Sequence, residues 1–228
     1  ILQYSVSGTD FPMEVGPDGK VTFPKGPIVT TVAHNAGYFV SASESEQLFN
    51  HVQLRSPQNP VPTDELERIR GDVEKAIAAK NCADFLKALL DETAILTGQP
   101  YRDIMVTFDN IRFSYGNPGT GYGGNATGSF ENGNAAALIR PFESNFISAD
   151  RSAFIRTQTA QNFLGETLHH VGTNRAYSDG FFANALNNIL VRQGRDKPQS
   201  FSDDNMAEIQ RASMYWHQRQ FEACKMRY

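Results

Sequence analysis

Apolar residues recur three and four positions apart over long stretches of the chain, which is the period of amphipathic helices. This spacing predicts a helical stretch over residues 64–97 that restarts at Asn81 and stops at Gly98. At its start, Asp64 and Glu67 match an N-cap and its capping-box partner. The same period predicts three later helices, over residues 157–171, from Ser178 to Gly194, and from Met206 to Phe221.

Between these helices the apolar residues alternate with polar ones, and many are β-branched or aromatic, as is typical of strands. Residues 103–108 and 111–115 are therefore predicted to form a pair of strands. Residues 116–133 are rich in Gly and Asn and predict a loop. Residues 136–141 predict a short edge strand, because Pro141 has no N–H group to donate to a ladder.

The first part of the chain has a different character. Short alternating runs at residues 20–23 and 28–32 are separated by Pro- and Gly-containing turn signals, which predicts β-hairpins. Three prolines between residues 57 and 62 then indicate a boundary. We expect a β-rich N-terminal section over residues 1–62 and an α+β domain over residues 63–228.

Composition narrows the classes of partner. The 228 residues, 40% of them hydrophobic, are enough to bury a core without metal or disulfide staples. The chain has 21 Lys and Arg residues and 25 Asp and Glu residues, so its net charge is −4. This negative charge argues against nucleic acid as a partner. No apolar run approaches the roughly 18–20 residues of a membrane span.

The two cysteines, Cys82 and Cys224, are too few for a Cys-rich zinc site. They form either one long-range disulfide or two buried thiols, and both alternatives stay open. Residues 125–127 form an N-glycosylation sequon, and a chain that begins at Ile1 is typical of a processed chain or an excised domain. The sequon favours a secreted or extracellular protein, whereas the start at Ile1 carries no information about export.

Residues 163–172 carry the pattern with the clearest chemical meaning. On a helix, positions 165 and 169 lie together at one edge of the apolar stripe, and Glu166 lies just beyond them. In a zincin helix, two imidazoles at i and i+4 bind the metal, and the Glu after the first is the general base. In this chain, His169 is at the position of the second metal ligand and Glu166 is at the position of the general base. Gly165 is at the position of the first metal ligand, but it has no side chain that could bind a metal.

Gly165–His169, followed by Tyr177-Ser178-Asp179, resembles the H-E-x-x-H…Y-S-D pattern of bacterial zincin-like metallopeptidases. The resemblance implies a zincin-like fold, in which a small mixed sheet packs with a backing helix and an active-site-type helix. It implies zinc as cofactor and a peptide or protein as substrate or partner. It also implies site roles for three residues, with His169 and Asp179 as metal ligands and Glu166 as the catalytic base.

What replaces the missing imidazole stays open, because a further ligand can come from the substrate or from His34, His51 or His217. His170 points about 100° away from His169 on a helix and can instead contact Glu166, four residues earlier. Tyr177 is a second catalytic candidate, since its hydroxyl can stabilise an oxyanion, but a tyrosine at a helix entry can equally be packed in the core.

Two functions follow from this pattern. The first is a zinc-dependent peptidase with a degenerate zinc motif, which the retained Glu166, His169 and Asp179 favour. The second is a catalytically inactive scaffold that serves as a structural, assembly or binding module, which Gly165 favours because zinc sites normally use three or four protein ligands.

Overall fold

The structure is a computed structural model that describes residues 3–6, 9–12, 14–15, 21–22, 59–116, 123–141 and 152–225. The described helices are α2 (Thr63–Ala78), α3 (Lys80–Thr97), α4 (Ile104–Phe108), α5 (Ser152–His169), α6 (Asp179–Arg192) and α7 (Met206–Ala223). The described strands are β1 (Gln3–Val6), β2 (Thr9–Pro12), β3 (Glu14–Val15), β4 (Val21–Thr22), β5 (Asn59–Pro60), β6 (Arg112–Tyr115), β7 (Gly124–Thr127) and β8 (Ala136–Ile139).

Near the N-terminus, β1 pairs with β2 and β3 pairs with β4, both antiparallel. β4 lies within the run at residues 20–23 that was predicted as a strand, and the β3–β4 pair spans the turn signal before this run, whereas β1, β2 and β3 were not singled out by the sequence. The predicted strand at residues 28–32 lies outside the described residues. Among the described residues, no helix combines the length and apolar character needed to cross a membrane.

A small mixed sheet has the strand order β5-β6-β8-β7. The pairing of β6 with β8 is parallel, and the two outer pairings are antiparallel. This sheet together with the helices confirms the α+β class. Because β5 pairs with β6, the sheet includes Asn59 and Pro60 from the section that was expected to precede the domain.

Two expectations about this sheet are wrong. β8 is not an edge strand, because it pairs with β6 on one side and with β7 on the other. Pro141 lies beyond Ile139, the last paired residue, so it interrupts no ladder. The edge strand is β7, which lies within the stretch predicted as a loop. Its Gly and Asn residues have low strand propensity, but pairing along the whole of β8 outweighs that preference.

Two local expectations are also corrected. Residues 103–108 were predicted as a strand, but they enter the helix α4 because the Asp103 carboxylate accepts a hydrogen bond from the Val106 N–H at 2.9 Å and caps it. The first long helix begins at Thr63 after Pro62, without a side-chain cap, so Asp64 is a first-turn residue rather than the N-cap.

Two other helix boundaries are as predicted, and those of α5 differ. α3 ends at Gly98, whose φ of 66° is the left-handed conformation that glycine adopts without strain. α6 begins after Ser178, whose hydroxyl accepts a hydrogen bond from the Phe181 N–H. α5 begins five residues earlier than predicted, at Ser152 rather than residue 157, and ends at His169.

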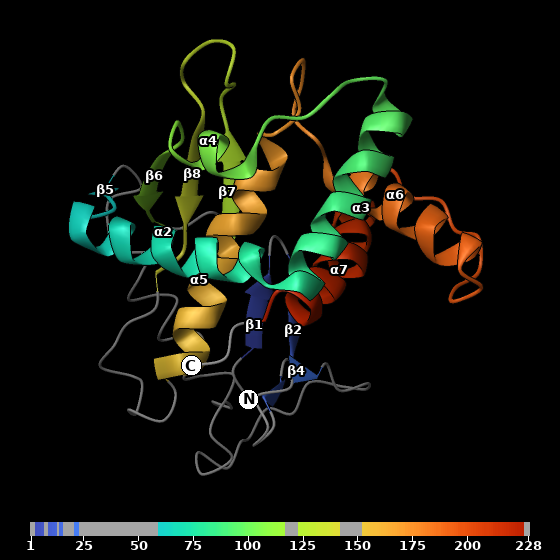
Figure 1. Ribbon diagram of the computed structural model, residues 1–228, viewed down its shortest axis with the longest axis horizontal. Helices are drawn as coiled ribbons and strands as arrows, with labels where there is room; N and C mark the ends of the chain where they lie inside the picture. The colour runs from blue at the N-terminus through green and yellow to red at the C-terminus, as the bar shows by residue number, and fades with distance from the viewer. Residues whose placement is uncertain are drawn as a thin grey trace.

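The helix α5 lies at the centre of the molecule and separates two groups of elements (Figure 1). On one side it packs against α2 and against β7 and β8 of the sheet. Its Phe163 is fully buried there, with ring centroids 4.8 Å from Phe113 of β6. On the other side, α6 packs between α3 and α7. The last turn of α5 therefore lies where the sheet side and the helical side meet.

A disulfide joins Cys82 of α3 to Cys224, the C-cap residue of α7. This decides between the two alternatives that the sequence left open. Both residues are buried, and they are 142 positions apart in the chain. A cross-link over so long a loop removes much conformational freedom from the unfolded chain, which stabilises the fold by several kcal/mol in the usual range of about 2–5 kcal/mol.

A second long-range tie is the ion pair between Glu92 of α3 and Arg192 of α6. Arg192 donates to both carboxylate oxygens at 2.9 and 2.7 Å, and the Glu92 side chain is 10% exposed. The guanidinium outweighs the effect of burial and lowers the pKa of Glu92 below its ordinary 4.5. The pair therefore stabilises the fold above pH 4.5, and this stability is lost as the pH falls through the lowered pKa.

We expect Arg192→Met to lower the free energy of unfolding at pH 7 by about 1–2 kcal/mol, because it leaves the mostly buried Glu92 carboxylate without its charged partner. The loss should shrink below pH 4.5, where Glu92 takes up a proton. Urea unfolding at several pH values measures both effects. Arg195→Met is the control, since exposed Arg195 contacts only the Gln193 side chain. An equal loss at pH 7 and at pH 4 would contradict this account of the pair.

Candidate metal site

His169 is held at the last position of α5 by a backbone hydrogen bond. Its Nδ1 lies 2.6 Å from the carbonyl oxygen of Tyr177, which can only accept, so Nδ1 carries the proton. The rings of Phe182 and Trp216 pack against the imidazole. As a result, the Nε2 lone pair is fixed in direction and faces Asp179, 3.8 Å from its Oδ1.

Asp179 is the first residue of α6, where the helix dipole favours a negative charge. Its Oδ1 accepts a hydrogen bond of 2.7 Å from the Trp216 indole and lies 3.8 Å from Nε2 of His217. The carboxylate is thus placed between two imidazoles that come from different helices. The family resemblance implied that Asp179 would lie beside His169, and the structure brings the two side chains together.

His217 of α7 supplies the third group. Its side chain is fully buried, and its Nδ1 lies 2.7 Å from Oε1 of Gln220. Its Nε2 is buried and has no hydrogen-bond partner. Of the three histidines that the sequence left open as extra ligands, His217 is the one found here, while His34 and His51 lie outside the described residues. An unpartnered buried ring nitrogen that faces a carboxylate is the feature that most strongly favours His217 as a ligand of a cation.

The ligand atoms of His169, Asp179 and His217 all lie within 4.8 Å of one another. This set of two neutral imidazoles and one carboxylate fits zinc, which binds nitrogen and oxygen donors in catalytic sites with three protein ligands. In each histidine the other ring nitrogen is hydrogen-bonded, which is the arrangement that orients metal-binding imidazoles. The residues present therefore fit the zinc ion that the sequence resemblance implies.

The electrostatics of the cluster also favour a cation. Burial disfavours the charged imidazolium of His169, but the carboxylates of Asp179 and Glu166 outweigh it and raise the pKa of His169. Burial and the neighbouring His169 keep the pKa of His217 well below its ordinary value, so this imidazole stays neutral. Burial raises the pKa of Asp179, against the attraction of His169. A bound dication would relieve the excess of acceptors at the centre.

Glu166 lies in the same pocket as His169 and Asp179. The pocket has a volume of about 470 Å³ and is bounded by the edge strand β7 on one side and by the start of α6 on the other. Glu166 is 2% exposed and packs against Gly124 so closely that a Cβ there would lie 2.7 Å from its Oε1. Met206 and Ile209 of α7 add an apolar wall. His217 does not line the pocket. Its buried side chain therefore approaches the cluster from the protein interior and not from the pocket.

The position of Tyr177 agrees with core packing rather than with the predicted oxyanion role. The residue is fully buried, and its hydroxyl donates to the carbonyl oxygen of Gln99 at 2.8 Å. Its contribution to the site is instead the backbone carbonyl that holds His169. His170 lies apart from the cluster, since its Nε2 is hydrogen-bonded at 3.0 Å to the Ala136 carbonyl oxygen in β8.

Comparison of the chain with protein-family models, with curated proteins and with solved structures found no match. Membership of the zincin-like family therefore stays a prediction from the short motifs, and the site must be judged on its own geometry.

We expect the purified protein to bind one zinc ion per chain, and His217→Ala to weaken binding by more than about 100-fold. The estimate follows because losing a hydrogen-bond partner of a ligand already costs about 10–100-fold in affinity. Competition with a chromophoric chelator measures both constants. His170→Gln, which changes the neighbouring histidine outside the cluster, is the control. Equal affinities for the His217 variant and the parent protein would remove His217 from the site.

Proposed function

We propose that this protein is a zincin-like, zinc-dependent hydrolase that acts on peptide or protein substrates. His169, Asp179 and His217 hold the metal, and Glu166 is the general base. One observation carries the proposal: three metal-ligating groups with oriented lone pairs converge beside a pocket that contains a buried glutamate.

The spacing within α5 supports this division of roles. Glu166 precedes His169 by three residues, so the two side chains lie near the same face of the helix and line one pocket. The metal ligand that a zincin helix would carry at position 165 is absent, but His217 compensates by reaching the cluster from α7. The number of protein ligands is then three, as in other catalytic zinc sites.

When bound, zinc supplies Lewis-acid chemistry that polarises a carbonyl group and makes nearby water more acidic. Glu166, held at the pocket wall, accepts the proton of the attacking water and returns it to the leaving amine. The neighbouring strand β7 is the last strand of the described sheet and offers main-chain groups to an extended peptide. Met206 and Ile209 provide room for an apolar side chain of the substrate.

The disulfide supports a secreted or extracellular location, because buried disulfides persist in oxidising compartments. The sequon at Asn125 falls in β7, at the pocket itself. A glycan on Asn125 would obstruct the pocket. We therefore propose a secreted or extracellular protein in which Asn125 is not glycosylated.

We expect Glu166→Gln to lower the rate of cleavage of a dye-labelled casein by about 100- to 10,000-fold, the range for loss of a general base, without loss of zinc. Fluorescence release and zinc content are measured on the same samples. Glu67→Gln is the control, because Glu67 is an exposed residue of α2. Cleavage at the parent rate by the Glu166 variant would exclude this residue as the base.

We also expect Gly124→Ala to reduce cleavage by about tenfold or more, because the new methyl group overlaps the Glu166 side chain and must displace its carboxylate. Zinc affinity should change little, since Gly124 does not contact the ligands in the cluster. Gly71→Ala makes the same substitution where no atom lies within 4 Å and serves as the control. An unchanged turnover number in the Gly124 variant would show that the position of Glu166 does not limit the reaction.

Gly165 favours the second function, an inactive scaffold that acts as a binding or assembly module. If the parent protein binds no zinc and cleaves no casein, this alternative replaces the hydrolase. Gly165→His then tests for a decayed metal site, because a restored imidazole next to His169 should return zinc binding to a framework that is otherwise intact.

A further inference from the structure

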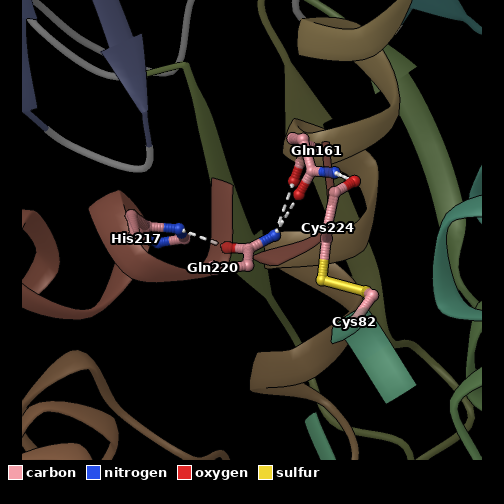
Figure 2. The surroundings of a disulfide bond; sticks show 5 residues. All are labelled: Cys82, Gln161, His217, Gln220 and Cys224. Atoms are coloured by element: carbon pink, nitrogen blue, oxygen red, sulfur yellow. Dashed lines mark hydrogen bonds between the residues drawn. A yellow bond between two sulfur atoms is a disulfide. The ribbon is translucent and has the colours of Figure 1, made fainter. Parts of the chain in front are cut away.

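A chain of hydrogen bonds connects the disulfide to the buried metal ligand His217 (Figure 2). The carbonyl oxygen of Cys224 accepts a hydrogen bond of 2.6 Å from Nε2 of Gln161. The Gln161 Oε1 accepts from Nε2 of Gln220 at 2.8 Å, and the Gln220 Oε1 lies 2.7 Å from Nδ1 of His217. The four residues of this chain of bonds are each at most 1% exposed, so water does not compete for the hydrogen bonds.

The Cys224 carbonyl sets the direction of every bond in this chain. A carbonyl oxygen can only accept, so Gln161 must turn its NH₂ group toward Cys224 and its oxygen toward Gln220. Gln220 must then present its NH₂ group to Gln161 and its oxygen to His217. That oxygen requires a proton on Nδ1, which leaves the lone pair of His217 on Nε2, the atom that faces Asp179.

The carbonyl itself is held in place by the disulfide. Cys224 is the C-cap residue of α7, and helix ends open more readily than helix centres. The bond to Cys82 ties this residue to α3, a different helix. Without the tie, the end of α7 is held only by packing and by the hydrogen bonds at its own terminus, so the Cys224 carbonyl is free to leave Gln161.

We infer that Gln220 is a positioning residue for His217 and that the Cys82–Cys224 disulfide, acting through Gln161 and Gln220, controls the zinc affinity of the site. The inference rests on the zinc site of the proposed function. A dithiol reductant breaks the S–S bond and gives its two electrons and two protons to form two thiols, while it closes to its own disulfide. The His217 tautomer is then no longer fixed, and part of the population carries the proton on Nε2, where it blocks metal binding.

This coupling gives the proposed hydrolase a built-in restriction to oxidising surroundings. In a reducing compartment the thiol form binds zinc weakly and is inactive, and formation of the disulfide completes the site. The expected loss is about 10–100-fold in zinc affinity, the usual effect of removing the hydrogen-bond partner of a metal-bound imidazole.

The experiment compares zinc affinities by chelator competition in the oxidised parent, the Cys82→Ser/Cys224→Ser double variant, Gln220→Leu with its disulfide intact, and the triple variant. Serines replace the cysteines so that no free thiol binds zinc. We expect the double variant and Gln220→Leu each to lose about 10–100-fold, and the triple variant to lose no more than either, because they break one pathway. Gln218→Leu, on the same helix beside His217 but outside the chain of bonds, is the control.

Nitrogen-15 NMR of the metal-free proteins supplies a readout that a general loss of stability would not move. The His217 ring should show its proton on Nδ1 in the oxidised parent and a mixture of tautomers in Gln220→Leu. Equal zinc affinities in parent and double variant overturn the inference and leave the zinc site standing. Failure of the oxidised parent to bind zinc overturns the proposed function, and the inference with it. Should the double variant not fold, Gln220→Leu still tests the link between the hydrogen-bond chain and His217, and a zinc affinity equal to that of the parent overturns the inference.

Discussion

Two imidazoles and a carboxylate that face one another at the junction of three helices are the constraint around which this protein is organised. The two imidazoles each use their proton at Nδ1, toward the Tyr177 carbonyl and toward Gln220, and so direct their Nε2 lone pairs at Asp179. Such a cluster is costly to bury unless a cation binds it. The Trp216 indole donates a hydrogen bond to only one of the two oxygens of the Asp179 carboxylate. A proton shared by His169 and Asp179, whose pKa values are both raised, or a bound cation would relieve the remaining excess of electron pairs.

Each ligand comes from a different helix, so the cluster exists only when α5, α6 and α7 are packed together. His169 ends α5, Asp179 begins α6, and His217 lies deep in α7. Aromatic rings fill the space between the three helices, with the Phe182 and Trp216 centroids 4.6 Å apart. The disulfide joins the end of α7 to α3, the helix on which α6 packs. The disulfide and the candidate metal site are therefore parts of one arrangement of helices.

The accuracy of the sequence predictions followed the range of the interactions involved. The helices around Gly98 and Ser178 were predicted correctly, because caps and apolar periodicity act within a few residues. The strands were predicted poorly, because pairing joins distant residues: β7 forms from Gly and Asn residues only since β8 is beside it. Glu166 and His169 were singled out because they lie one turn apart on a helix, and Asp179 through the family resemblance. His217 was only one of three equal candidates, although a histidine on the apolar stripe of its helix was a signal.

By itself, the sequence determined the local chemistry: an acid and an imidazole one turn apart on a helix, an aspartate at the start of the next helix, and a glycine where a first ligand would stand. These depend on covalent spacing and helix geometry alone. Only the tertiary structure decided that the cysteines are joined, that the Tyr177 hydroxyl is used in the core, and that His217 completes the cluster. Each of these contacts joins segments far apart in the chain, whose meeting depends on how all the helices and the sheet bury their apolar faces together.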